Sequence, residues 1–149
     1  MAKKVFGEKD SEYGVFLNNI GYFFLQQGDL DLAESYLMRS LEASQNAHGE
    51  GHPTEIYPLQ LLAQVYMNKH EYEKAENNFA LCTDIAKNVF GEKHPTYISN
   101  LTFVGTYYYE LGQFDRAEKL YKEALERYEN LYGKQHQDYA GNLHNFGRF

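Results

Sequence analysis

Apolar residues recur along this chain at intervals of three and four positions, in six stretches separated by short polar breaks. This spacing places the apolar side chains of each stretch on one face of an α-helix. The pattern predicts three pairs of helices, and the short breaks make the two helices of a pair antiparallel neighbours. The first helices carry Leu17, Ile20 and Phe24, then Leu59, Leu62 and Tyr66, then Leu101, Val104 and Tyr108; the second helices carry Ala33, Leu37 and Leu41, then Ala75 and Phe79, then Ala117, Tyr121 and Leu125.

The whole pattern returns every 42 residues, and a glycine marks each boundary: Gly7, Gly49, Gly91 and Gly133. One helical hairpin cannot cover its own apolar face, so each pair must stack on the next. We therefore predict an all-α fold, an α-solenoid of antiparallel helix-turn-helix repeats. The repeats form a single domain over residues 1–149, with repeat 1 at 5–48, repeat 2 at 49–90, repeat 3 at 91–132, and a partial repeat or capping helix at 133–149.

The breaks inside the repeats predict their own geometry. Gly28 and Gly112 stand where a left-handed residue ends a helix, a conformation that glycine adopts without strain. His70 occupies the same place in the second repeat, so a residue with a side chain must hold a strained or different turn there. Pro58 falls in the first helix of the second repeat and lacks a backbone N–H. We expect that helix to begin late or to be irregular near residues 54–57.

Other local signals concern the starts of helices and the ends of the chain. His52-Pro53 and His94-Pro95 place proline where a first-turn N–H has no partner, and their recurrence favours a capping or packing role for histidine. Asp10-Ser11 supplies N-cap residues in the first repeat. The segment 2–9 nearly copies 86–93, and Leu143-x-x-Phe146-Gly147 copies Leu101-x-x-Val104-Gly105. We expect the chain to be a segment of a longer array.

Composition narrows the class of protein. With 14 Lys and Arg against 21 Asp and Glu, the formal charge is -7, which opposes binding to nucleic acid or to anionic lipid. No apolar run approaches the roughly 20 residues of a membrane span. The single cysteine, Cys82, excludes an intrachain disulfide and is compatible with a reducing compartment. We expect a cytoplasmic protein that does not insert into membranes.

Candidate chemistry is sparse. His48 and His52 are four residues apart, but the intervening glycines form a loop and no Cys/His quartet with zinc spacing accompanies them. Cys82 aligns with Ser40 and Ala124, a position for a small packed residue. Asn100-Leu101-Thr102 fits a glycosylation sequon, yet Leu101 is a predicted core residue. Phosphate loops, zincin motifs and nucleophile elbows are missing. We predict no metal site, no cofactor and no enzymatic activity.

The landmarks resemble the tetratricopeptide repeat, whose pattern is W-x2-L-G-x2-Y followed by A-x3-F and a closing proline. The second copy reads Leu59-x2-Leu62-Ala63-x2-Tyr66 with Ala75-x3-Phe79, and the other two copies agree with it. The closing proline is absent, and the period exceeds the roughly 34 residues of the common repeat. The longer period, the boundary motifs at 49–53 and 91–95 and the run Leu17-Asn-Asn-Ile-Gly21 look like the kinesin light chain subtype. The resemblance implies a right-handed superhelix.

In that family the first helices line a concave groove that holds an extended or partly helical peptide. Asn and Gln amides there can bond a peptide backbone, and Tyr offers an apolar body with a polar tip. Asn18, Gln60 and Thr102 stand where a carboxylate-gripping member would need basic residues, so that ligand class is not supported. The resemblance implies these groove residues: Asn18, Asn19, Tyr22, Leu25, Tyr57, Gln60, Gln64, Met67, Thr102, Thr106, Tyr109, Asn145 and Arg148, with Val15, Leu61, Ser99, Phe103 and His144 beside them.

Two interpretations of function remain open. The first is a non-catalytic scaffold that binds a peptide or protein segment in the groove. The second is a regulatory or self-associating segment of a larger signalling protein or enzyme, in which the groove binds an intramolecular element or the open repeat ends meet another copy. The identity of the partner is not encoded in any motif of the sequence.

Overall fold

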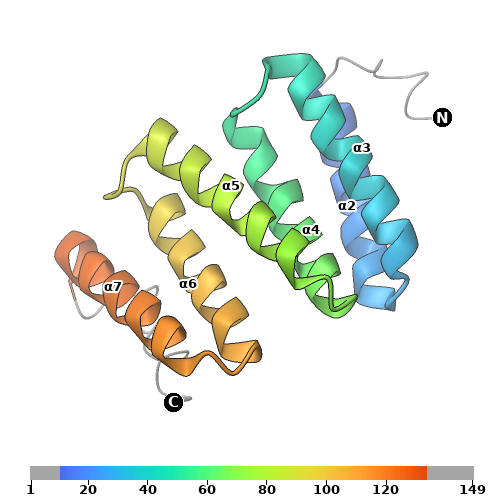
Figure 1. Ribbon diagram of the computed structural model, residues 1–149. Coiled ribbons are helices and arrows are strands. Elements are labelled where there is room, and N and C mark those ends of the chain that lie inside the picture. The colour runs from blue at the N-terminus through green and yellow to red at the C-terminus, as the bar shows by residue number, and fades with distance from the viewer. Residues whose placement is uncertain (1–10, 134–149) are drawn as a thin grey trace. The chain divides into compact units, whose positions relative to one another are not determined.

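The computed structural model describes residues 11–133, and helices account for nearly all of them (Figure 1). The elements in chain order are α2 (Ser11–Gln27), α3 (Leu30–His48), the 3₁₀ turn η1 (Pro53–Glu55), α4 (Ile56–Asn68), α5 (Tyr72–Phe90), α6 (Pro95–Glu110) and α7 (Phe114–Tyr132). The all-α prediction is confirmed for this range. Predictions that rest on residues 1–10 or 134–149, among them the Asp10 cap and the partial last helix, lie outside the described residues.

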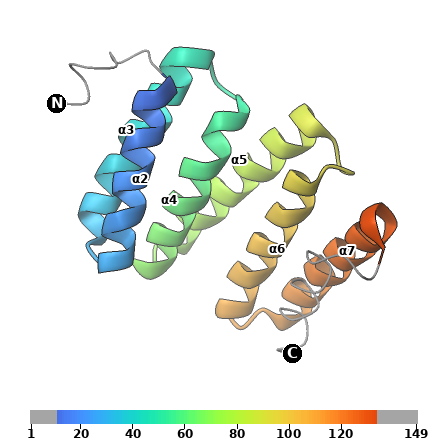
Figure 2. The ribbon, with the colours of Figure 1, turned by 180° about the vertical axis from the view of Figure 1, so that it is seen from behind.

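The chain divides into two compact units, Met1–Ile85 and Ala86–Phe149, with the boundary near the end of α5. The first unit contains α2, α3, η1, α4 and most of α5. The second contains α6 and α7. Figures 1 and 2 view the chain from opposite sides, and both show α2 packed against α3 and α6 paired with α7. Each pair is the hairpin that the apolar spacing predicts.

Close helix packing explains why a small residue recurs in the middle of each first helix. A Cβ atom added to Gly21 of α2 would lie 2.6 Å from Cγ of Leu37 in α3, so the two helices approach as closely as glycine allows. In the second unit, a Cβ on Gly105 would lie 3.0 Å from the ring of Tyr121. Ala63 takes this place in α4 and is fully buried. The small residue and the bulky residue facing it together set the spacing of each hairpin.

The three turns inside the hairpins share one geometry. Gly28, His70 and Gly112 all have positive φ, at 81°, 60° and 72°. Their backbone N–H groups donate to the carbonyl three residues earlier, as from His70 to Met67 at 3.0 Å. His70 is thus a side-chain-bearing residue in a left-handed turn, as predicted, and its Nδ1 lies 2.9 Å from the Tyr72 hydroxyl. That contact offsets part of the strain.

Histidine caps the first helix in two repeats. Nδ1 of His52 accepts a hydrogen bond from the backbone N–H of Thr54 at 3.3 Å, and Nδ1 of His94 accepts one from Thr96 at 3.2 Å. Glu55 completes a capping box, because its carboxylate accepts from the His52 backbone N–H at 3.0 Å. These contacts confirm the capping role that the recurrence of histidine favoured.

Pro58 delays the start of the first helix of repeat 2, as expected. The segment begins as the 3₁₀ turn η1, and α4 starts only at Ile56. Pro58 is therefore the third residue of α4, where a backbone N–H would have no intrahelical partner. The missing N–H therefore costs no bond within α4, and the expectation of a late and irregular start is confirmed.

Inside the first unit, α3 covers one face of α4 through a small polar network. The Tyr66 hydroxyl donates to Glu34 Oε1 at 2.9 Å, and the Lys69 ammonium bonds Asp31 at 2.6 Å and Glu34 at 2.7 Å. Burial raises the pKa of Glu34, but the hydrogen bonds from Lys69 and Tyr66 outweigh it and leave that pKa below its usual value. Burial and the Glu34 bond raise the pKa of Tyr66 to about 12. This network joins α3, the second helix of repeat 1, to α4, the first helix of repeat 2.

Candidate peptide-binding pocket

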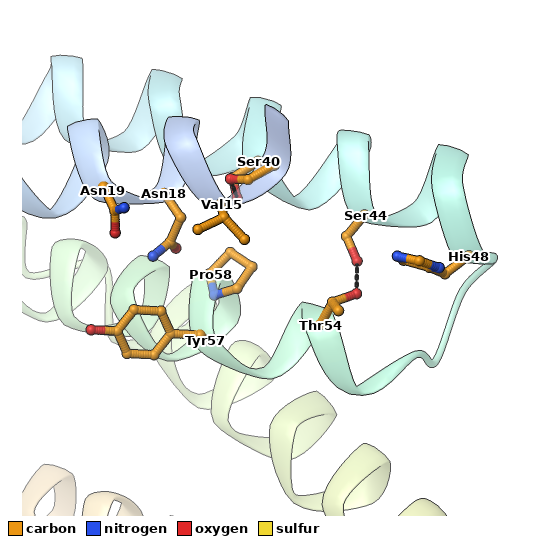
Figure 3. Close-up of a pocket in the computed structure, with 10 residues that line it drawn as sticks. Val15, Asn18, Asn19, Ser40, Ser44, His48, Thr54, Tyr57 and Pro58 are labelled. Carbon is orange, nitrogen blue, oxygen red and sulfur yellow. Dashed lines mark hydrogen bonds between the residues drawn. The ribbon is translucent and has the colours of Figure 1, made fainter. Parts of the chain in front are cut away.

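A pocket of about 310 Å³ opens inside the first unit, where α2, α3, η1 and α4 meet (Figure 3). Two of the residues predicted for the groove, Asn18 and Asn19, approach it from α2, and a third, Tyr57, approaches it from α4. Val15 was expected beside the groove, and the other lining residues were not predicted to be part of it. Among the described residues, the lining consists of Gly14, Val15, Asn18, Asn19, Ser40, Ser44, His48, Thr54, Tyr57 and Pro58.

Gly14 lines the hollow and has no side chain to place in it. A Cβ atom added there would lie 3.6 Å from both the Ala43 Cβ and the Ser40 carbonyl oxygen, which is ordinary contact and not a clash. One period later the equivalent residue is Ile56, which is buried. The hydroxyl of Ser40 donates to the Gly14 carbonyl at 2.7 Å, and the Cys82 thiol donates likewise to Ile56 at 3.4 Å. The backbone contact is repeated, but in the first repeat the space that a side chain would fill is empty.

The other end of the pocket is held by polar contacts between α3 and η1. The hydroxyls of Ser44 and Thr54 are hydrogen-bonded to each other, as the dashed line in Figure 3 marks. Next to them the His48 ring stacks on the capping ring of His52, with centroids 4.2 Å apart. The late start of α4 places Pro58 opposite α2, and its ring offers no donor to the pocket. The walls are therefore mostly apolar, and their polar groups are largely engaged with one another.

Asn18 is the exception among these polar groups. Its side chain is 5% exposed, and its Oδ1 is buried without a hydrogen-bond partner in the part of the chain that the structure describes. Figure 3 shows the amide extending from α2 toward Pro58 and Tyr57. A buried acceptor left without a donor costs about 1–3 kcal/mol. Such a group in a native structure needs an explanation, and a ligand that donates a hydrogen bond is one.

Exposed side chains surround this acceptor. Val15 is 60% exposed and Tyr57 is 54% exposed, and Asn19 is also open to solvent. Tyr22 and Gln64 are exposed on the same two helices, while Gln60 is half-buried. Val15 and Tyr57 supply apolar surface at the mouth of the pocket, and Asn19 supplies free amide groups.

Three residues predicted for the groove lie in the core. Leu25, Leu61 and Met67 are buried, so the expectation that they line an open surface is not met. The helical spacing accounts for this result, because first helices of stacked repeats are covered on more than one side. Sequence spacing alone did not distinguish a position beside the groove from one beneath it.

In the second unit the groove candidates are largely engaged in internal contacts. The Thr106 hydroxyl donates to the Thr102 carbonyl at 3.1 Å and lies 2.9 Å from the Tyr121 hydroxyl. The Tyr109 ring meets Phe114 edge-on at 5.5 Å. Ser99 is half-buried and Phe103 is exposed. His144, Asn145 and Arg148 lie outside the described residues.

Residues 11–133 offer little other chemistry. Within that range, no three or more His, Cys, Asp or Glu side chains are grouped so that they could hold a metal ion. None of the helices described there is long and apolar enough to cross a membrane. Asn100 of the sequon is fully buried, so a glycan could not be attached without disrupting the helix. Cys82 is also buried, and burial raises its pKa to about 12.

Comparison with known proteins agrees with this geometry. The family model described as "Tetratricopeptide repeat" matches residues 13–70, 58–130 and 99–148. The chain belongs to the tetratricopeptide repeat family. Proteins of this family generally mediate protein–protein interactions and are typically non-catalytic scaffolds. A comparison with curated protein sequences finds no match.

Solved structures with the same fold are of the kinesin light chain type. BtubC (BKLC) from P. vanneervenii matches with a TM-score of 0.79 and 20% identity, over 91% of this chain and 54% of that one. Nearly identical TPR-like repeats of a Podosopora anserina kinesin light chain match with a TM-score of 0.75 and 16% identity, over 89% and 63% of the two chains. The tetratricopeptide chain described here thus spans between half and two thirds of these neighbours. At these identities the likeness establishes the fold alone.

Proposed function

We propose that this tetratricopeptide segment is a non-catalytic, cytoplasmic scaffold that binds an extended or partly helical peptide across α2 and α4. The peptide places one uncharged apolar side chain in the pocket beside Gly14. One of its backbone N–H groups donates to Oδ1 of Asn18. The observation that carries this proposal is the buried, unpartnered Asn18 oxygen in a mostly apolar pocket whose rim is exposed.

The chemistry of the lining favours an uncharged anchor. Among the described residues that line the pocket, none is Lys, Arg, Asp or Glu, and His48 is the residue that can carry a charge. A charged side chain would lose its hydration without gaining a partner, which is strongly unfavourable. An apolar side chain contributes about 1.5–3 kcal/mol when fully buried. A backbone N–H of the bound peptide would also donate to the unsatisfied Oδ1 of Asn18.

Exposed side chains beside the pocket supply the remaining contacts. The Tyr57 ring offers rigid apolar area with a hydroxyl at its tip, as is common at interaction sites. The amides of Asn19 and Gln64 can bond a peptide backbone without selecting its sequence. Many modest contacts around one anchored side chain give moderate affinity, as expected for a scaffold.

A random-peptide display library selected on the intact chain tests this proposal. Each enriched peptide is then measured against the parent, Asn18→Leu and Tyr57→Ala. Leu131→Ser is the matched control, because Leu131 is exposed on α7 and takes no part in the pocket. We expect Asn18→Leu and Tyr57→Ala each to weaken binding about tenfold or more, which corresponds to about 1.4 kcal/mol. Equal affinity for all four proteins would refute the proposed site.

A further inference from the structure

The second repeat has an aliphatic side chain at the position where the first repeat has a glycine beside the pocket. Ile56 comes one period after Gly14, and only 7% of it is exposed. The carbonyl groups of both residues accept a hydrogen bond from the second helix of their own repeat, so their backbones are held alike. The second repeat thus shows which side chain this position of the repeat can bury, namely that of isoleucine.

A second position is also smaller in the first repeat, but its lost volume is replaced. Ala43 stands where the second repeat has Ile85. Tyr13 belongs to the same core cluster as Ala43 and is itself only 6% exposed, so its ring occupies space beside the shorter side chain. Gly14 has no comparable replacement, because the pocket beside it is open. What the first repeat lacks there is the side chain of one isoleucine.

The size of the pocket agrees with one aliphatic side chain and a short stretch of backbone. Its volume is about 310 Å³. Truncation of a single leucine in a protein core leaves a cavity of about 150 Å³, so one aliphatic side chain fills roughly half of this space. The remainder can hold a peptide backbone, one N–H of which donates to the buried Oδ1 of Asn18. That oxygen has no hydrogen-bond partner among residues 11–133.

The hydrogen bond to Asn18 also restricts the conformation of the ligand. Beyond the first turn of an α-helix, each backbone N–H already donates to a carbonyl of the same helix. An extended segment, in contrast, has N–H groups that are free to bond a side chain. Residues with a β-branched side chain favour extended backbone and have few rotamers to lose on burial. Isoleucine and valine therefore suit both the backbone and the space beside Gly14.

We propose that the pocket selects an extended peptide segment whose anchor is a β-branched aliphatic residue, with isoleucine preferred. The anchor occupies beside Gly14 the place that the Ile56 side chain occupies in the second repeat, while a backbone N–H bonds Asn18. This inference rests on the peptide-binding function proposed above and names the class of segment that the site recognises. The competing anchor is an aromatic ring, and measurement separates the two.

Filling the pocket from within tests the space without any peptide. Gly14→Ile in the intact chain is compared with Gly14→Ala. Alanine is the better helix former, so helix propensity alone would make the alanine variant the more stable. We expect Gly14→Ile instead to have a Tm at least about 3 °C above that of Gly14→Ala, because it buries an aliphatic side chain. A Tm equal to or below that of Gly14→Ala would overturn the proposal, because the space would not accept isoleucine.

Two peptide display libraries measure the choice of anchor directly. Both are random except for one fixed central residue, which is isoleucine in one library and phenylalanine in the other. Each enriched peptide is measured again after its fixed residue is exchanged for that of the other library. We expect the isoleucine version to bind the parent at least about tenfold more tightly than the phenylalanine version. Gly14→Ile should weaken the binding of isoleucine peptides by a similar factor, since the pocket is then filled.

The outcomes distinguish this inference from the proposed function. If phenylalanine peptides bind as tightly as isoleucine peptides and Asn18→Leu weakens them, the peptide site stands and the assignment of a β-branched anchor is overturned. If neither library yields a peptide that Asn18→Leu weakens, the peptide site itself is refuted and the inference fails with it. Leu131→Ser is again the control and should leave every affinity unchanged, because Leu131 lies on α7.

Discussion

Replacing Asn18 with leucine should stabilise the fold while it removes binding. Oδ1 of Asn18 is buried without a donor among residues 11–133, and this costs the folded state about 1–3 kcal/mol. Leucine removes the unsatisfied acceptor and is a better helix former by a few tenths of a kcal/mol. The adjoining pocket of about 310 Å³ leaves room for the branched side chain. We expect the free energy of unfolding to rise by about 1.5–3 kcal/mol.

The measurement should report on the first unit specifically. Urea unfolding followed by far-ultraviolet circular dichroism gives the stability of the whole chain. Labelling of the Cys82 thiol adds a local probe, because this thiol lies in the first unit and is fully buried. Its pKa, raised to about 12 by burial, keeps it protonated near neutral pH. Labelling should therefore follow the opening of this unit and become slower in Asn18→Leu.

Asn19→Leu is the matched control for the stability measurement. Asn19 neighbours Asn18 on the same helix, but its side chain is exposed. The same change there should alter stability by no more than about 0.5 kcal/mol. If Asn18→Leu lowers stability by 1 kcal/mol or more, then the Asn18 oxygen is satisfied in the free protein. The argument that it awaits a ligand would then fail.

Three further predictions concern the scaffold. Gly14→Ala should raise the free energy of unfolding by about 1 kcal/mol, since a Cβ fits there. Gly21→Ala should lower it by up to about 2 kcal/mol, because the added Cβ clashes with Leu37. Urea unfolding measures both changes. His94→Ala should lower the free energy of unfolding by about 1 kcal/mol because the helix cap is lost, whereas His94→Asn should retain most of the stability. Equal losses for the two variants in thermal melts would exclude capping as the cause. Stability should decline as pH rises from about 10 to about 12, because the pKa of Tyr66 is raised to about 12 on folding; Tyr66→Phe should make the decline shallower in urea titrations across that range.

The regular features of the fold could be predicted because they depend on local rules. Apolar spacing determines which helix faces are buried, and proline and histidine at 52–53 and 94–95 have roles that follow from helix ends. His70 could be assigned a left-handed turn because glycine takes that place in the other two repeats. Each of these predictions rests on residues within one helix or one turn.

The pocket could not be predicted in the same way because it arises from a missing side chain. Gly14 looks like a tolerated helix glycine in sequence, and only its contrast with Ile56 one period later hints at a space. Asn18 was expected to be a groove residue, but its burial depends on Pro58 and Tyr57 of another helix. Leu25 and Met67 were assigned to the groove by the resemblance to the family, but they are buried. Tertiary packing decides between those outcomes.

Repetition with local variation thus connects the sequence to the proposed activity. A few landmark positions recur from one repeat to the next because the stacking of helices requires them. The first repeat departs from that pattern at Gly14, which lines the pocket where the second repeat has the buried Ile56. Departures that cost stability within a regular scaffold are the places where function is expected.

The most direct test of the central claim is a double-mutant cycle between Asn18 and the backbone of a selected peptide. One variant is Asn18→Leu, and the other is the peptide with a methyl group on the backbone nitrogen nearest its anchor residue. If that N–H donates to Asn18, methylation should weaken binding about tenfold with the parent and hardly at all with Asn18→Leu, a coupling of at least 1 kcal/mol. Losses that simply add would contradict the account, because Asn18 and the peptide N–H would then act independently.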